Sequence, residues 1–149
     1  MILLDTNVVS EPLRPKPDRN VLGWLDAQVV ETLYLSTVSL AELLLGIESL
    51  PAGKRRKALA AALAEQVIAL FGERIVPFDL AAAQTYGKIV TRARRGGYPI
   101  AVADAQIAAI AASRHSSVAT RDEAPFQAAG VAVINPWTAA PEAPRADPD

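Results

Sequence analysis

Four carboxylates occupy positions in this sequence where an acidic side chain is unusual, either directly after a predicted strand or within an apolar helix. Asp5 directly follows the apolar run of residues 2–4, and Asp122 follows the predicted strand at residues 116–120. Glu42 lies in the leucine-rich stretch "SLAELLLG", and Asp104 shares a helical stripe with Ile107 in "PIAVADAQIAAIAAS". An aspartate on an apolar stripe costs free energy unless a cation or hydrogen-bond donors compensate. A cluster of such oxygen ligands, without His or Cys, suits Mg²⁺ or Mn²⁺.

Each acid also has an ordinary structural interpretation, and taken singly these alternatives stay open. Asp5 and Asp122 have the character of turn or helix-capping residues. Ser39 and Glu42 have the spacing of a capping box, in which the glutamate bonds the first amide of its helix. Asp104 could face solvent, because alanine occupies much of the circumference of its helix and tolerates either environment. The four together favour a shared site, because ligands of parallel sheets bind beyond the carboxyl ends of the strands.

The elements that must position these acids alternate along the chain. Strands are predicted at residues 2–4, 32–37, 74–78, 116–120 and 131–135. Helices are predicted at residues 20–28, 39–50, 53–72, 79–95, 99–114 and 124–130. In the 53–72 helix the predicted buried stripe is Leu59, Leu63, Val67 and Leu70. This alternation predicts an α/β fold, a three-layer α/β/α sandwich with a central parallel sheet.

Length and composition bound the class of protein. The 149 residues suit one domain with a sizeable core, and 51% of them are hydrophobic. The absence of Cys excludes disulfides, thiol catalysis and Cys-based zinc sites, and the single His, His115, argues against a histidine-rich metal site. There is no recognisable signal peptide and no apolar run of about 20 residues, so we expect a cytoplasmic protein without a membrane span.

The net charge of −1 hides an uneven distribution. Residues 139–149, rich in Pro and Ala, hold three acids and one base and are predicted to form a disordered tail. The remaining residues 1–138 therefore carry a net charge of +1, or +5 when the four acids of the candidate site are set aside. An acidic centre in a mildly basic body suits a phosphate-bearing substrate with a metal between it and the protein.

Four segments carry a resemblance to a known family. "ILLDTNVVSE", "SLAELLLGI", "IAVADAQIAAIA" and "VATRDEAPF" follow one another in the order and spacing of PIN-domain ribonuclease motifs. The chain resembles this family over residues 1–138, and within it the VapC-like toxins of type II toxin–antitoxin pairs. The segments "DTNVVSEPLRP" and "INPW", the latter at residues 134–137, are most similar to the FitB branch.

The resemblance implies a PIN-like α/β domain and a metal-dependent endoribonuclease that hydrolyses phosphodiester bonds of single-stranded RNA with Mg²⁺ or Mn²⁺. It places the catalytic acids at Asp5, Glu42, Asp104 and Asp122, of which Asp5, Asp104 and Asp122 are the metal ligands. The supporting positions that it implies are Thr6, Asn7 and Thr120. The fourth acid is Asn in some relatives, and Glu123 is an alternative to Asp122.

The resemblance also implies partners. A small VapB- or FitA-like antitoxin would pack along a groove of the toxin, and promoter DNA would be contacted only through that antitoxin. The assembly would be a homodimer or a toxin–antitoxin hetero-oligomer.

The basic residues beside the acids are candidate RNA contacts, namely Arg92, Arg94, Arg95 and Arg121. For the first three, the alternative is a helix end whose charges complement the helix dipole. For Arg121, the alternative is that it neutralises the acidic cluster. Trp137 is interpreted as a packing residue rather than a base-stacking platform.

The rival function is a binding module: a PIN fold with weak nuclease activity that represses a promoter together with its antitoxin. A phosphotransfer receiver and an aspartate-nucleophile phosphatase fit less well. Each would want a second acid close to Asp5, where Thr6 and Asn7 stand instead.

Overall fold

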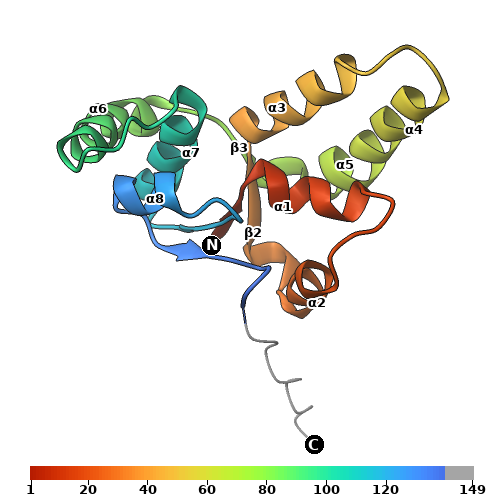
Figure 1. Cartoon of the computed structure of the whole chain (residues 1–149), viewed down its shortest axis with the longest axis horizontal. Coiled ribbons are helices and arrows are strands. Elements are labelled where there is room, and N and C mark those ends of the chain that lie inside the picture. The colour runs from red at the N-terminus through yellow and green to blue at the C-terminus, as the bar shows by residue number, and fades with distance from the viewer. Residues whose placement is uncertain (140–149) are drawn as a thin grey trace, which may run out of the picture.

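A parallel sheet of five strands, in the order β3-β2-β1-β4-β5, forms the centre of the fold (Figure 1). The structure is a computed structural model that describes residues 1–139. The strands are β1 (Ile2–Leu4), β2 (Leu33–Ser36), β3 (Ile75–Val76), β4 (Ser117–Ala119) and β5 (Val133–Ile134). The central strand β1 pairs with β2 on one side and β4 on the other, with Leu4 opposite Leu35 and Ala119. The predicted parallel sheet is confirmed, with somewhat shorter strands than the sequence suggests.

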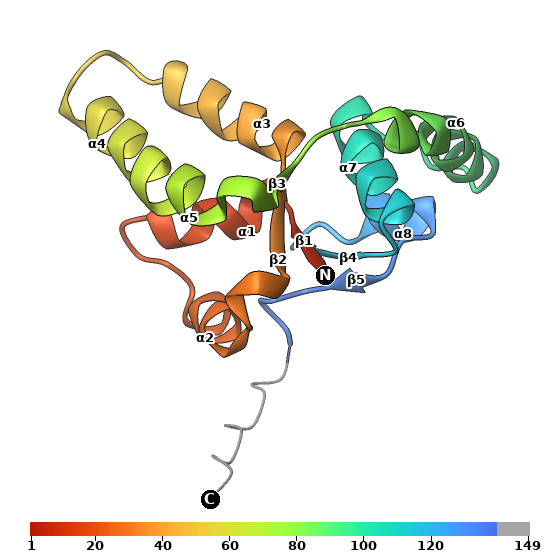
Figure 2. The same cartoon turned by 180° about the vertical axis from the view of Figure 1, so that it is seen from behind.

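Helices cover both faces of this sheet. They are α1 (Thr6–Ser10), α2 (Arg19–Ala27), α3 (Thr37–Glu48), α4 (Lys54–Ala62), α5 (Ala69–Phe71), α6 (Leu80–Arg95), α7 (Val102–Ser113) and α8 (Ala124–Ala129). Three short 3-10 segments, η1 (Glu11–Leu13), η2 (Val30–Thr32) and η4 (Gly72–Arg74), and a π-helical segment, η3 (Leu63–Ile68), complete the described elements. Both views show α1, α2, α4 and α5 on one side of the sheet and α6, α7 and α8 on the other (Figures 1 and 2). The predicted three-layer α/β/α arrangement is therefore present.

Two apolar cores follow from the alternation of side chains along the strands. Leu3 and Val118 point into the core beneath α6, α7 and α8, whereas Leu4 and Ala119 point into the core beneath α1 to α5. Leu3 and Leu4 are both essentially inaccessible to solvent, as expected for a parallel sheet covered on both faces. Within residues 1–139, no helix has the length and apolar character needed to cross a membrane.

The start of the chain contains a helix that the sequence did not predict. Of the two structural interpretations of Asp5, a turn residue or a helix cap, the second holds. Asp5 caps α1, and its carboxylate accepts a hydrogen bond from the N–H of Thr6 at 2.8 Å. With only five residues, α1 is too short to give a clear helical period.

Two further helix boundaries differ from the prediction. Helix α3 is capped by Ser36, whose Oγ accepts from the N–H of Ser39 at 2.9 Å, so the alternative of a capping box between Ser39 and Glu42 is wrong. Helix α7 begins at Val102 rather than at residue 99, which leaves Ile100 outside the helix although it packs against the core.

The predicted 53–72 helix is one continuous helical segment with the π-helical segment η3 in its middle. Leu63 and Val67 are buried as predicted, but Leu70 is 56% exposed and Phe71 takes its place in the core. The wider π turn accounts for this, because it places the next buried residue four positions after Val67. The predicted disordered tail at 139–149 lies outside the described residues, except for Ala139.

Candidate metal centre

Asp5 lies at the carboxyl end of the central strand and is held on every side. Its N–H donates to the carbonyl of Ala119 at 2.9 Å, which continues the β1–β4 ladder by one residue. Its Oδ1 accepts from the Thr6 N–H, and its Oδ2 accepts from the Thr120 hydroxyl at 2.8 Å. The residue is only 7% exposed. Burial raises the pKa of Asp5, the bonds from Thr120 and Thr6 lower it, and the nearby charges of Glu42 and Asp122 raise it again.

Thr120 and Asn7 connect the ends of the two central strands. Thr120 is fully buried, and besides donating to Asp5 its Oγ accepts from the Asp122 N–H at 3.1 Å. The Asn7 side chain amide lies 3.4 Å from the same Oγ and 3.5 Å from the Asp5 carboxylate. Its Oδ1 accepts from the N–H of Arg121 at 3.3 Å. The supporting positions Asn7 and Thr120 therefore orient Asp5 and the loop that carries Asp122.

Glu42 enters the site from α3, in the second turn of that helix. Its Oε1 accepts a hydrogen bond from the Thr6 hydroxyl at 3.0 Å, which ties α3 to the start of α1. Thr6 thus bonds Asp5 through its backbone and Glu42 through its side chain. Glu42 is exposed, so its carboxylate keeps its other lone pairs available to solvent or to a cation.

Asp104 lies in the first turn of α7, and its helical face is the buried one. Ile107 and Ala111, three and seven residues further on, are fully buried, whereas Asp104 itself is partly exposed. Burial, then the charges of Asp5, Asp122 and Glu42 in that order, raise the pKa of Asp104 to about 6. The alternative that Asp104 faces solvent is therefore wrong in part. The carboxylate is half-buried, and it lies close enough to the other three acids for their charges to raise its pKa.

Asp122 and Glu123 follow β4 but differ in their surroundings. Asp122 is exposed and does not cap α8, because the residue before that helix is Glu123, which makes no capping bond either. The Glu123 carboxylate instead accepts a bond from the Asn135 side chain at 3.2 Å. Asp122, and not Glu123, is among the charges that raise the pKa of Asp5 and Asp104. Of the two, Asp122 is therefore the one that belongs to the acidic cluster.

The four carboxylates form one electrostatic unit with no counter-charge from the described chain. None of them makes an ion pair with a side chain of residues 1–139. No cation is among the groups that shift the pKa of Asp5 or Asp104. The donor set is all oxygen, which fits a hard divalent cation. No three acidic or histidine side chains of this part of the chain already meet the geometry of a bound ion.

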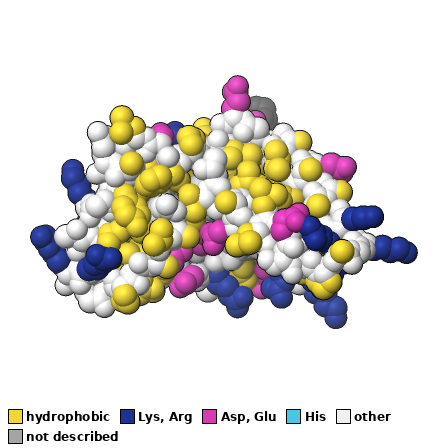
Figure 3. All heavy atoms as spheres, turned by 90° about the horizontal axis from the view of Figure 1, so that it is seen from above, with side chains coloured by type: hydrophobic (Ala, Val, Ile, Leu, Met, Phe, Trp, Pro, Cys, Tyr) yellow, Lys and Arg dark blue, Asp and Glu magenta, His cyan; other side chains and the backbone are white. Residues whose placement is uncertain are grey.

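The basic residues do not join this cluster. Lys88, Arg92 and Arg95 line a separate hollow on α6, and the Arg92 guanidinium packs against Gly130. The Arg121 guanidinium lies over the ring of Trp137, 5.3 Å from its centroid. Seen from above, basic side chains lie around the left, right and lower margins of the molecule, with acidic and apolar side chains between them (Figure 3).

A groove extends from the acidic cluster between α1, α3 and α4. It has a volume of about 850 Å³, and Thr6 and Glu42 line it together with apolar side chains such as Leu43, Ile47 and Leu59. Arg14 and Arg55 also line it. The groove is therefore apolar along its length, acidic where it meets the site, and basic at two further points.

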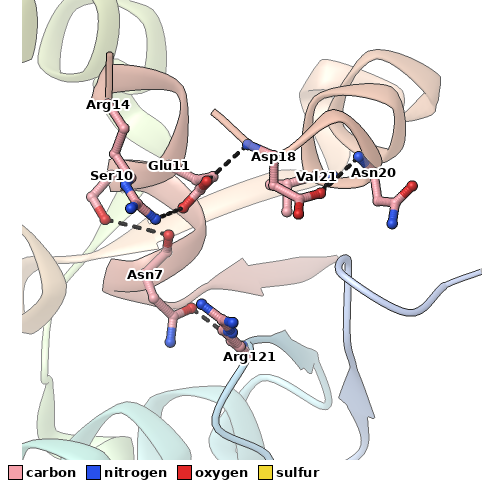
Figure 4. A network of polar contacts seen from close by, with 8 residues as sticks. All are labelled: Asn7, Ser10, Glu11, Arg14, Asp18, Asn20, Val21 and Arg121. Atoms are coloured by element: carbon pink, nitrogen blue, oxygen red, sulfur yellow. Dashed lines mark hydrogen bonds and ion pairs between the residues drawn. The ribbon is translucent and has the colours of Figure 1, made fainter. Parts of the chain in front are cut away.

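Glu11 is a buried acid that the sequence analysis did not single out. It is 4% exposed, and its carboxylate accepts from the N–H of Asp18 at 2.8 Å and from the Arg14 guanidinium at 3.2 Å (Figure 4). Asp18 in turn caps α2. Glu11 thus fixes the loop that borders the groove. The signal that could have found it is an acid flanked by apolar residues, in "VVSEPL".

Comparison with known proteins gives a consistent family. The model of the PIN domain matches residues 2–131. "VapC ribonuclease Y4jK" of Sinorhizobium fredii is 48% identical over 137 residues, which are 92% of this chain and 98% of that protein. "Toxin FitB" of Neisseria gonorrhoeae is 49% identical over 137 residues, or 92% and 99% of the two chains. The crystal structure of FitAcB from Neisseria gonorrhoeae superposes with a TM-score of 0.89 at 48% identity, covering 93% of this chain and all of that one.

Proposed function

The chain belongs to the PIN-domain family, and on this premise we propose that it is the toxin of a type II toxin–antitoxin pair, acting as a metal-dependent endoribonuclease. The observation that carries the proposal is the cluster of Asp5, Glu42, Asp104 and Asp122. These acids come from four separate segments, repel one another, and lack a cationic partner within residues 1–139. A protein keeps such a repulsion where a bound cation offsets it.

Asp5, Asp104 and Asp122 would hold Mg²⁺ or Mn²⁺, with Glu42 as a further ligand or as the residue that positions a water molecule. When bound, the metal supplies a water molecule of lowered pKa and charge stabilisation for the phosphate. Glu42 and Asp122 are exposed, so their carboxylates are accessible to a cation from solvent.

The chain's own residues prepare the site for a phosphodiester. Thr120 and the Thr6 N–H hold both oxygens of Asp5 and favour its charged form. The Thr6 hydroxyl fixes one oxygen of Glu42 and leaves the other free to accept a proton or a hydrogen bond from the attacking water. Arg121, beside Asp122, is a candidate contact to the RNA, as are Arg92, Arg94 and Arg95.

Partners follow from the similarity to the relatives. We propose a small FitA- or VapB-like antitoxin that reaches promoter DNA on behalf of the pair, since a solved structure 46% identical to this chain (TM-score 0.90) is described as FitAB bound to a DNA fragment. The assembly would be a homodimer or a toxin–antitoxin hetero-oligomer, and a cytoplasmic location remains a prediction.

The test is cleavage of a mixed pool of single-stranded RNA by the protein without its antitoxin. We expect cleavage with Mg²⁺ or Mn²⁺, none in EDTA, and none by Asp104→Asn with metal. Asp26→Asn, an exposed aspartate on α2 outside the cluster, serves as the matched control and should cleave as the wild type does. Undiminished cleavage in EDTA would refute the metal mechanism.

The second candidate is the binding module with weak nuclease activity. One observation favours it: no three acids of the described chain already meet the geometry of a bound ion. It predicts tight binding of antitoxin and promoter DNA by a folded protein, with no metal-dependent turnover of any RNA.

A further inference from the structure

Arg121 lies in the sequence between Thr120 and Asp122, two residues of the acidic site, yet its side chain pairs with neither of them. Its backbone N–H donates to Asn7 Oδ1, which fixes the residue beside the end of β1 (Figure 4). Its side chain is exposed, and it makes no ion pair or side-chain hydrogen bond with residues 1–139. An arginine beside four unneutralised acids would be expected to pair with one of them. Here the guanidinium lies instead over the indole ring of Trp137.

Trp137 is itself held firmly, so it can act as a rigid support. Its backbone N–H donates to Asn135 Oδ1 at 3.0 Å, and its backbone carbonyl accepts from the Asn20 side chain at 3.1 Å. The ring is partly buried against the core beneath α1 to α5. The packing role predicted for Trp137 is therefore confirmed, but one part of the ring also carries the Arg121 guanidinium.

The cation–π contact leaves the guanidinium ready for an anion. An arginine held over an indole ring makes no hydrogen bond to that ring plane, so its N–H donors stay free for another partner. The planar fork of an arginine matches two oxygens of a phosphate group. Holding the side chain in place in advance also lowers the entropy lost on binding.

We propose that Arg121, positioned by Trp137, binds a phosphate of the RNA strand next to the acidic site. Arg121 is the contact residue and Trp137 the positioning residue. The inference rests on the proposed function, since RNA is the ligand. It assigns Trp137 a role beyond packing, and it separates Arg121 from Lys88, Arg92 and Arg95, which line a hollow of their own on α6.

The experiment measures RNA binding rather than cleavage, so that it stands apart from the nuclease test. The parent protein is Asp104→Asn in EDTA, which keeps the strand intact, and the probe is a short fluorescein-labelled single-stranded RNA of random sequence. We expect Arg121→Gln to weaken binding at least about tenfold. It should also lower the slope of log affinity against log salt by about 0.7, as expected for one lost phosphate contact on a single strand. Lys57→Gln, which removes an exposed charge on α4, should change neither quantity in this way.

A double-mutant cycle tests the role of Trp137. Trp137→Leu should weaken binding about two- to fivefold, and Trp137→Phe, which keeps an aromatic face, should restore most of it. In the Arg121→Gln background, Trp137→Leu should cause no further loss. Thermal unfolding of each variant confirms that it is folded, and Trp137→Phe keeps the test valid if the leucine variant is not.

Three outcomes would overturn the inference: no measurable RNA binding by the parent, an unchanged affinity or salt slope in Arg121→Gln, or an equal effect of Trp137→Leu with and without Arg121. Failure of the proposed function would appear differently. The wild type would then show no metal-dependent cleavage, whatever the binding results were.

Discussion

Asp104→Asn should make the metal-free protein more stable at neutral pH while abolishing its cleavage of RNA. The reason is that folding brings the Asp104 carboxylate out of water and towards three other acids, which raises its pKa from 3.8 to about 6. The native state therefore binds a proton more tightly than the unfolded chain does. The stability of the wild type falls as the pH rises from about 4 to about 6 and stays low above that range.

The expected gain can be bounded from the pKa. A shift of about 2 units corresponds to at most about 3 kcal/mol. Asp104 is only half-buried, so solvent screening reduces this to about 1.5 kcal/mol. The start of α7 favours a negative charge by about 0.5 kcal/mol, which the asparagine gives up. The net gain is about 1 kcal/mol in the free energy of unfolding, or about 3 °C in Tm.

Urea unfolding in EDTA, measured at about pH 8 and again at about pH 4, checks this expectation. The gain should be present at the higher pH and mostly lost at the lower one, where the native-state aspartate is protonated and the unfolded-state aspartate, with a pKa of 3.8, is only partly ionised. Asp26→Asn, outside the cluster, should show no such difference. The reasoning is refuted if Asp104→Asn is less stable than the wild type at about pH 8, or if its gain is the same at both pH values.

Further predictions concern the residues around Asp104. Thr120→Val should cost about 2 kcal/mol of stability, because a buried hydroxyl that bonds a carboxylate and the Asp122 N–H is lost. The same change should raise the pKa of Asp5 further, so the rising limb of the cleavage rate against pH should move to higher pH. Ser36→Ala should lower the free energy of unfolding by about 1 kcal/mol through loss of the α3 cap, with thermal unfolding as the measurement. Mg²⁺ should raise the Tm of the wild type but leave that of Asp5→Asn unchanged, and an equal rise in both would place the ion elsewhere.

The acidic cluster could be predicted from the sequence because each acid breaks a local pattern. Asp5 and Asp122 follow strands, and Asp104 interrupts a helical face that is otherwise buried, with Ile107 on it. Parallel strands bring their carboxyl ends to one edge, so the topology follows from the alternation of elements and the cluster follows from the topology.

The sequence did not predict the local features that depend on contacts between distant segments, namely helix α1, the cap of α3 and the position of the Arg121 side chain. Helix α1 is stabilised by its cap at Asp5 and by the bonds of the Asn7 side chain with Thr120 and Arg121, which follow β4, and neither leaves a periodic pattern in five residues. Ser36 and Ser39 both suit a helix cap, and only the end of β2 decides between them. The place of Arg121 depends on Trp137, sixteen positions away, and nothing in the spacing of the two indicates that they are in contact.

The backbone hydrogen bond from the Asp5 N–H to the Ala119 carbonyl joins Asp5 to the central sheet, so the sheet fixes the position of its carboxylate. Its amide lies in the ladder between the two innermost strands, so it should exchange its hydrogen with solvent only when the whole domain unfolds. Asp122, by contrast, lies with Arg121 on the exposed stretch between β4 and α8, which can open locally. Heating should therefore displace Asp122 before Asp5, and a partly warmed protein would lose its activity while the Asp5 amide was still protected.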